Sequence, residues 1–166
     1  MNITYQWKKK VFSDSFKVFS DDAQIARLKN KAFSNTALGE VGGKHYNFKT
    51  KGFFKQRTVV IDENADSQVG EINYSHWKSK AEVKLHGKTY TVKYNNFFNT
   101  KWSVENTEGK QIQYSVKGLA KGRIDSETDD PLLLLTGLQT HNYFQQVTMV
   151  IIVAVFVPIW ASASGG

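Results

Sequence analysis

The C-terminal stretch PLLLLTGLQTHNYFQQVTMVIIVAVFVPIWASASGG, residues 131–166, contains no formally charged side chain. All 22 Lys and Arg and all 15 Asp and Glu precede it. It follows Asp129 and Asp130 and opens with Pro131, and this order is typical of a helix start. An Asp accepts hydrogen bonds from the first helical N–H groups, and Pro suits the first helical position. The fold therefore depends on what surrounds an uncharged helix.

This stretch divides into two parts. The first, 131–144, is rich in Leu and then turns polar, whereas the second, 147–160, holds twelve apolar residues in fourteen. A membrane-spanning helix needs about 20 apolar residues, and runs of 10–14 more often mark a buried element. A single helix over 131–160 would extend about 45 Å, which is longer than a small barrel. We therefore predict a break near 142–146. After it, 147–160 either packs on the domain as a strand or helix, which we favour, or emerges into a membrane.

Residues 1–127 have the pattern of short strands joined by frequent turns. In AEVKLHGKTYTVKY, 81–94, apolar and polar residues alternate on both sides of His86-Gly87, which predicts a tight β-hairpin. The stretches at 101–116 and 56–74 are predicted to form two further hairpins. Segment 21–33 fits either a short helix capped by an Asp or a strand, and its neighbours favour strand. Many short strands with regular turns indicate a sandwich or barrel.

A weak repeat links two parts of this β region. The sequence from Tyr46 to Val60 matches that from Tyr90 to Val104 at an offset of 44 residues, and each copy contains a Phe pair followed by a basic residue. The repeat indicates two related lobes of one closed β structure. Chance similarity between aromatic strands is the alternative.

Motifs for catalysis or for binding a cofactor or metal are not found in the sequence. It has no Cys, and its four histidines (His45, His76, His86 and His141) are scattered without metal-ligand spacing. The stretch GEVGGKH, 39–45, departs from the spacing of a phosphate-binding loop and is interpreted as a glycine turn. The sequence therefore predicts a protein that is not an enzyme and has no metal or small-molecule cofactor.

Composition and charge suggest the kind of partner. The chain has 166 residues, 40% of them hydrophobic, and a net charge of +7, which fits one folded domain with a basic surface. Such a surface favours anionic partners such as lipid headgroups or nucleic acid. No secretory signal is recognised at the N-terminus, so we expect an intracellular location, in the cytoplasm or at the cytoplasmic face of a membrane.

The run of aromatic strands over residues 3–127 and the closing DPLLLLTGLQTHNYF resemble the tubby-like superfold, in particular the phospholipid scramblase and LURP-one-related families. In the closing segment the resemblance lies in a pattern of small, polar and aromatic residues: Leu135, Gly137, Asn142, Tyr143 and Phe144. It implies a mainly β protein, in which a closed antiparallel barrel of about a dozen strands surrounds an apolar C-terminal helix. The predicted domain is then 1–146 with a central helix over 131–144, followed by 147–166. The side chains expected to fill the barrel are Leu132, Leu133, Leu134, Leu135 and Leu138.

The resemblance also implies binding of phosphoinositide or other phospholipid headgroups, and thus a module that acts at anionic membrane surfaces. The basic residues that we predict for this role are Lys51, Lys55, Arg57 and Lys101 near the Phe pairs, and Lys8, Lys9 and Lys10 as a second patch. One alternative is an intracellular structural or protein-interaction barrel without a lipid ligand. A second alternative, disfavoured, is a nucleic-acid-binding β module whose aromatic strands stack bases.

Overall fold

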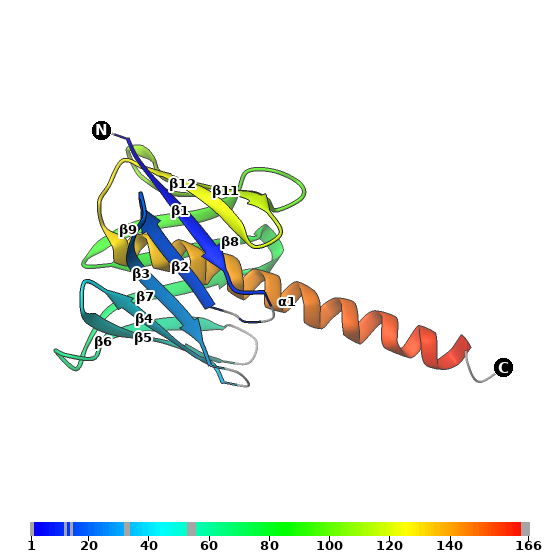
Figure 1. Cartoon of the computed structure of the whole chain (residues 1–166). Helices are drawn as coiled ribbons and strands as arrows, with labels where there is room; N and C mark the ends of the chain where they lie inside the picture. The colour runs from blue at the N-terminus through cyan, green and yellow to red at the C-terminus, as the bar shows by residue number, and fades with distance from the viewer. Residues whose placement is uncertain (1, 12, 14, 32–33, 53–55, 164–166) are drawn as a thin grey trace.

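The protein is a closed antiparallel barrel of twelve strands with one long helix running through it (Figure 1). The computed structural model describes residues 2–11, 13, 15–31, 34–52 and 56–163, without the side chains of 78, 110, 157–159 and 161. Lys55, one of the predicted headgroup-binding residues, lies outside these ranges. The fold class predicted from the sequence is confirmed.

The strands follow one another round the barrel in chain order, each antiparallel to the next, and β1 closes the barrel against β12. Their bounds are β1 Ile3–Lys9, β2 Ser15–Ser20, β3 Ala23–Asn30, β4 Thr36–Val41, β5 Lys44–Lys51, β6 Arg57–Asp62, β7 Ser67–Ser75, β8 Lys80–Leu85, β9 Lys88–Tyr94, β10 Lys101–Asn106, β11 Gly109–Gly118 and β12 Lys121–Ser126. A single turn of 3-10 helix, η1 His76–Lys78, joins β7 to β8.

The predicted hairpins are present. The turn between β8 and β9 consists of His86 and Gly87, both with positive φ (49° and 75°). A two-residue turn needs such φ values to match the twist of the two strands that it joins. The ambiguous segment 21–33 contains a turn at 21–22 and strand β3, so the strand reading was correct.

The internal repeat reappears as a repeat of strands. Strands β3, β4, β5 and β6 begin at residues 23, 36, 44 and 57, and β7, β8, β9 and β10 begin at 67, 80, 88 and 101, so each start is offset by the same 44 residues. Two consecutive four-strand units of equal spacing therefore make up most of the barrel wall.

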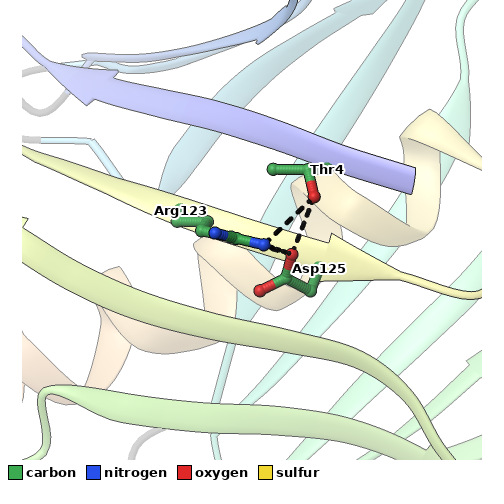
Figure 2. A network of polar contacts seen from close by, with 3 residues as sticks. All are labelled: Thr4, Arg123 and Asp125. Atoms are coloured by element: carbon green, nitrogen blue, oxygen red, sulfur yellow. Dashed lines mark hydrogen bonds and ion pairs between the residues drawn. The ribbon is translucent and has the colours of Figure 1, made fainter. Parts of the chain in front are cut away.

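The seam between the first and last strands is tied by side chains as well as by the strand ladder (Figure 2). Asp125 Oδ1 accepts hydrogen bonds from Thr4 Oγ1 at 2.9 Å and from Arg123 Nη2 at 2.7 Å. Partial burial would raise the pKa of Asp125, but the hydrogen bonds from Arg123 and Thr4 outweigh it and lower the pKa. The seam thus holds an ionised carboxylate that links β1 to β12.

Helix α1, Pro131–Ala163, begins as the sequence predicts. Asp130 Oδ1 accepts hydrogen bonds from the backbone N–H groups of Leu132 at 3.0 Å and Leu133 at 3.2 Å. The first turns then lie inside the barrel in one continuous core with the strand side chains. The leucine side chains predicted to fill the barrel are all at 0–2% exposure: Leu132, Leu133, Leu134, Leu135 and Leu138.

Gly137 allows the helix and the barrel wall to approach closely. A Cβ at this position would lie 2.3 Å from the hydroxyl oxygen of Tyr114 on β11. That hydroxyl donates a hydrogen bond to the carbonyl oxygen of Leu134 at 3.1 Å, and the Tyr114 ring stacks on Trp102 of β10. A glycine is therefore needed where this aromatic wall meets the helix.

The predicted break near 142–146 is wrong, because α1 continues without interruption to Ala163. Nor does the segment 147–160 pack on the barrel: its described side chains beyond Val147 are exposed, and the helix projects from one end of the molecule (Figure 1). The barrel does not limit the length of the helix, because the helix passes through it and out.

Candidate functional site: the barrel end from which the helix projects

The two ends of the barrel can be compared through the segments that join their strands. At the first end, called the cap end, α1 begins beside the connections 21–22, 42–43, 63–66, 86–87, 107–108 and 127–130. At the other, called the exit end, α1 leaves the barrel among connections whose described residues are 10–11 and 13, 31 and 34–35, 52 and 56, 76–79, 95–100 and 119–120. Antiparallel pairing of successive strands makes the connections alternate between the two ends.

The cap end is acidic and polar. Its connections are described in full, and they contain eight carboxylates, no Lys or Arg and no large apolar residue: Asp21, Asp22, Glu63, Asp66, Glu108, Glu127, Asp129 and Asp130 are the acids. Most of these connections are two-residue turns, which solvate readily. The cap end thus has the character of an ordinary solvent-facing surface.

The exit end presents apolar side chains to solvent. In the described part of the chain, the exposed large hydrophobic residues lie either on exit-end connections or on α1 beyond residue 144. Trp77 is 99% exposed and Leu119 fully exposed, and the other connection residues are Val11, Phe97 and Phe98. Clusters of exposed apolar side chains mark interaction sites far more often than single ones do.

Local hydrogen bonding holds one of these apolar connections in shape. The Asn96 side chain accepts hydrogen bonds from the backbone N–H groups of Thr100 and Lys101, both at 3.0 Å. Asn99 takes a positive φ of 55°, which Asn tolerates better than most residues. Phe97 and Phe98 sit at the tip of this turn, edge to face at 5.5 Å. The sequence therefore builds a closed turn that displays two aromatic rings.

Basic residues concentrate at the same end. Of the twelve strand residues that border the exit end, six are basic and none is acidic: Lys9, Lys51, Arg57, Lys80, Lys101 and Lys121. Of the twelve that border the cap end, Lys44 and Lys88 are basic and Asp62 is acidic. The charge of the barrel is therefore polarised along its axis, positive where the apolar residues are exposed.

Cross-strand pairing brings several of these cations together. Lys8 on β1 lies directly opposite Lys17 on β2 and Lys121 on β12. Lys51 opposes Arg57, and Lys80 opposes Lys93. Like charges directly opposite each other destabilise a sheet. Glu71, 3.4 Å from Arg57, and Glu105, 2.8 Å from Lys93, offset part of this repulsion.

The predicted headgroup-binding residues all border the exit end where they are described, but they do not form one pocket. Lys51 and Arg57 are neighbours on β5 and β6, and Arg57 also contacts Glu71 at 3.4 Å. Lys101 on β10 lies four strands from β6 and three from β1, which carries Lys8 and Lys9. Lys10 follows β1. The cations thus form a ring round the barrel mouth, and Lys17, Lys31, Lys80 and Lys121 belong to it although the sequence reasoning missed them.

An aromatic collar surrounds the helix as it leaves the barrel. His141 stacks on Trp102 with ring centroids 4.0 Å apart, and Tyr143 stacks on Tyr74 of β7 at 3.6 Å. Burial, and secondarily the charge of Lys9, lowers the pKa of His141 to about 3. Burial raises the pKa of Tyr94, and its hydroxyl forms a hydrogen bond with Nδ1 of His141 at 2.9 Å. The collar fixes where the helix emerges.

Beyond the collar the helix stays apolar but loses its packing. We call residues 147–163 the outer half of α1 and residues 131–144 the inner half. Side chains of the outer half from Met149 to Phe156 include six hydrophobic residues more than half exposed, and Trp160 is exposed as well. Over the described residues, no helix reaches the length and hydropathy that crossing a membrane requires.

Two grooves flank the helix at the exit end. The larger, with a volume of about 970 Å³, lies between α1 and the strand ends on the side of β1, β2, β10 and β11, and the smaller, of about 430 Å³, lies on the side of β3 to β6. Both volumes fall in or near the range of about 300–1,000 Å³ found for small-molecule sites.

Two buried polar groups that line the larger groove, the Asn142 amide and the Trp7 indole N–H, have no hydrogen-bond partner in the described structure. Asn142 is 1% exposed, yet neither atom of its amide is hydrogen-bonded within the described structure. By contrast, the buried Thr136 and Thr140 hydroxyls donate to helix carbonyl oxygens one turn earlier, at 2.8 and 2.9 Å. Buried polar atoms in folded proteins are nearly always paired, so Asn142 marks this groove. The sequence places Asn142 in the closing pattern of small, polar and aromatic residues, but it does not show that its amide is unpaired.

Among the described residues, no group of three or more His, Asp or Glu side chains is placed to hold a metal ion. Comparisons with protein-family models, with curated proteins and with solved structures give no match. The relationship to the tubby-like superfold therefore stays a prediction, and the site has to be interpreted from its own chemistry.

Proposed function

We propose that this protein is a non-enzymatic β-barrel module that docks on anionic membrane surfaces through its exit end. In this proposal the outer half of α1 inserts into the apolar layer of the membrane, and the apolar connections enter the interface around it. The ring of cations meets the lipid phosphates, and the cap end faces the aqueous phase.

The observation that carries the proposal is the coincidence of two distributions. Exposed apolar side chains and basic strand ends gather at one end of the barrel, and carboxylates gather in the connections of the other. Membrane interfaces favour aromatic residues such as Trp77, which combine an apolar ring with a polar edge, together with Lys at headgroup depth. A protein partner would account for the apolar residues, but an anionic lipid surface accounts for both distributions.

The expected electrostatic and apolar contributions to the free energy of membrane binding are large enough for stable docking. A basic residue near an anionic surface contributes about 1 kcal/mol, and a ring of six or more exceeds what weak peripheral binding requires. Burial of apolar side chains adds about 25 cal/mol for each Å² removed from water. The 17 residues of the outer half would extend about 25 Å as a helix, which places most of their apolar surface within reach of the hydrocarbon layer.

The test is sedimentation of the full-length protein with vesicles of phosphatidylcholine alone or with added phosphatidylserine. We expect binding to the anionic vesicles that weakens as the salt concentration rises, because exposed charges are screened. The double variant Lys101→Glu/Lys121→Glu should lower the affinity at least about tenfold.

The matched control is Lys44→Glu/Lys88→Glu, which changes the net charge by the same amount but at the cap end. The altered lysines of both double variants are exposed. This control should bind as the unmodified protein does. Equal losses in the two double variants would show that only net charge matters and would contradict docking by the exit end. Equal binding to neutral and anionic vesicles would remove the role of the cations.

A further inference from the structure

The larger groove has a defined polar floor. One face of α1, with His141, Asn142 and Gln145, lines it at the level of the aromatic collar, and Met149 continues that face outward. Phe98 and Leu119 line it as well, from two exit-end connections. The groove therefore runs from a polar, buried region beside the collar to an apolar region beside the outer half of α1.

The amide of Asn142 defines what the polar region can bind. Its Nδ2 can donate two hydrogen bonds and its Oδ1 can accept them, and neither has a partner in the described fold. Leaving such a group buried and unpaired costs free energy. A ligand with acceptor and donor oxygens, such as a phosphate ester with a neighbouring hydroxyl, would complete both sides of the amide.

The charged side chains of the groove select the sign of the ligand. Lys9 and Lys31 line it, and no carboxylate does so among its described lining residues. The Lys9 ammonium lies 5.4 Å from the centroid of the Phe16 ring, at the wall of the groove. Phosphate oxygens suit such a setting, because they accept charge-assisted hydrogen bonds from lysine.

We propose that this groove binds one molecule of an anionic phospholipid, with its phosphate and glycerol oxygens on Asn142, Lys9 and Lys31 and its acyl chain along Phe98, Leu119 and the outer half of α1. This inference rests on the proposed function and deepens it, since it names the lipid class that the exit end recognises. In this arrangement the barrel binds one lipid headgroup in the groove and also docks on the anionic membrane surface.

The test uses the full-length protein in an uncharged detergent, with bound lipid counted by native mass spectrometry. The probe is 1-oleoyl-lysophosphatidate, compared with 1-oleoyl-lysophosphatidylcholine and with glycerol 3-phosphate. We expect one lysophosphatidate retained per chain, with weaker retention of the zwitterionic lipid and of the headgroup without its chain.

Two pairs of variants locate the binding. Asn142→Leu removes both amide atoms and should lower lysophosphatidate affinity at least about tenfold. Its control is Gln139→Leu, which removes another buried amide of α1, one that faces the smaller groove. Lys31→Glu should likewise weaken binding, whereas Lys44→Glu, an exposed lysine of the cap end, should leave it unchanged.

The same experiment separates this inference from the proposed function. Equal retention of lysophosphatidate by Asn142→Leu and Gln139→Leu would show that the groove is not an anionic lipid site, even where vesicle binding persists. Equal retention of the two lysolipids by the unmodified protein would show the same. If lysophosphatidate is retained but the protein ignores anionic vesicles, the groove stands and membrane docking fails. Should Asn142→Leu fail to fold, the exposed pair Lys31→Glu and Lys44→Glu decides.

Discussion

The two halves of α1 both lack charge but lie in opposite environments. The inner half, 131–144, and the outer half, 147–163, are both uncharged and mostly apolar. Leu132 to Leu135 are at most 2% exposed inside the barrel, whereas side chains from Met149 to Phe156 stand in the open. One continuous helix thus serves as the core of a domain and then as an unpacked apolar surface. Hydrophobicity alone does not say which of the two a segment is, because burial depends on what the rest of the chain builds around it.

The largest expected effect is the difference in folding stability between matching Asp substitutions in the inner and outer halves of α1. Leu134→Asp places a carboxylate at a fully buried position, without a partner, and should cost more than about 5 kcal/mol, enough to unfold the protein. The same change in the outer half, Ile152→Asp, should alter the free energy of unfolding by less than about 0.5 kcal/mol. Chemical denaturation of both variants measures the difference. Similar losses of stability would mean that the outer half is packed.

Membrane binding should show the reverse pattern. The double variant Ile152→Asp/Phe156→Asp introduces two charges into the segment proposed to enter the apolar layer, where each charge costs about 2.5–3.5 kcal/mol at the centre and less near the surface. We expect vesicle affinity to fall at least about a hundredfold while the thermal midpoint stays unchanged. The control, Asp21→Lys/Asp22→Lys at the cap end, should not weaken binding. Unchanged affinity of the helix variant would exclude insertion of the outer half.

Substitution of Gly137 sharpens the account of the inner half. In an exposed helix, Ala in place of Gly stabilises by about 1 kcal/mol. At Gly137 the added Cβ would lie 2.3 Å from the Tyr114 hydroxyl, and overpacking of this kind costs about 1–3 kcal/mol. Gly137→Ala should therefore lower the free energy of unfolding, and a stabilised variant would show that the helix lies further from β11 than the structure places it.

The collar at the boundary between the halves predicts a pH dependence. Because burial holds the pKa of His141 at about 3 in the fold, against about 6.5 in the unfolded chain, the unfolded state binds the additional proton between these values. Stability should therefore fall as the pH drops below about 6.5, by about 1.4 kcal/mol per pH unit from this group. His141→Phe keeps a ring on Trp102 and should flatten the profile between pH 6.5 and 4.5. An unchanged slope would assign it to other groups.

Much of the fold could be predicted from the sequence, because local chemistry decided it. His86-Gly87 supplies the positive φ of a hairpin turn, Asp130 caps the helix, and alternation of apolar residues marks the strand faces. The break near 142–146 was predicted because a helix over 131–160 would be longer than a small barrel, whereas α1 runs on to Ala163. The sequence also turns polar just before that point. In the structure the Thr140 hydroxyl bonds back to the helix and His141 stacks within the collar, so polarity at these residues does not interrupt the helix.

The exit end could be predicted only in part. The basic residues near the Phe pairs were identified, but their arrangement as a ring depends on the order and register of the strands. A usable signal was present once strands are assigned. Alternate connections contain Val11, Trp77, Phe97, Phe98 and Leu119, while four of the six intervening ones contain acidic residues and none contains Lys or Arg. The groove and the unpaired amide of Asn142 required the packed structure, because burial without a partner is a property of three dimensions.

The most direct test of the central claim measures which end of the barrel enters the membrane. The chain has no Cys, so one introduced Cys carries an environment-sensitive fluorophore to a single place. We would label Leu119→Cys at the exit end and Asp66→Cys at the cap end and add phosphatidylserine-containing vesicles to each. Docking by the exit end predicts that the emission at residue 119 shifts to the blue while that at residue 66 stays unchanged. A shift at residue 66, or at both positions alike, would contradict it.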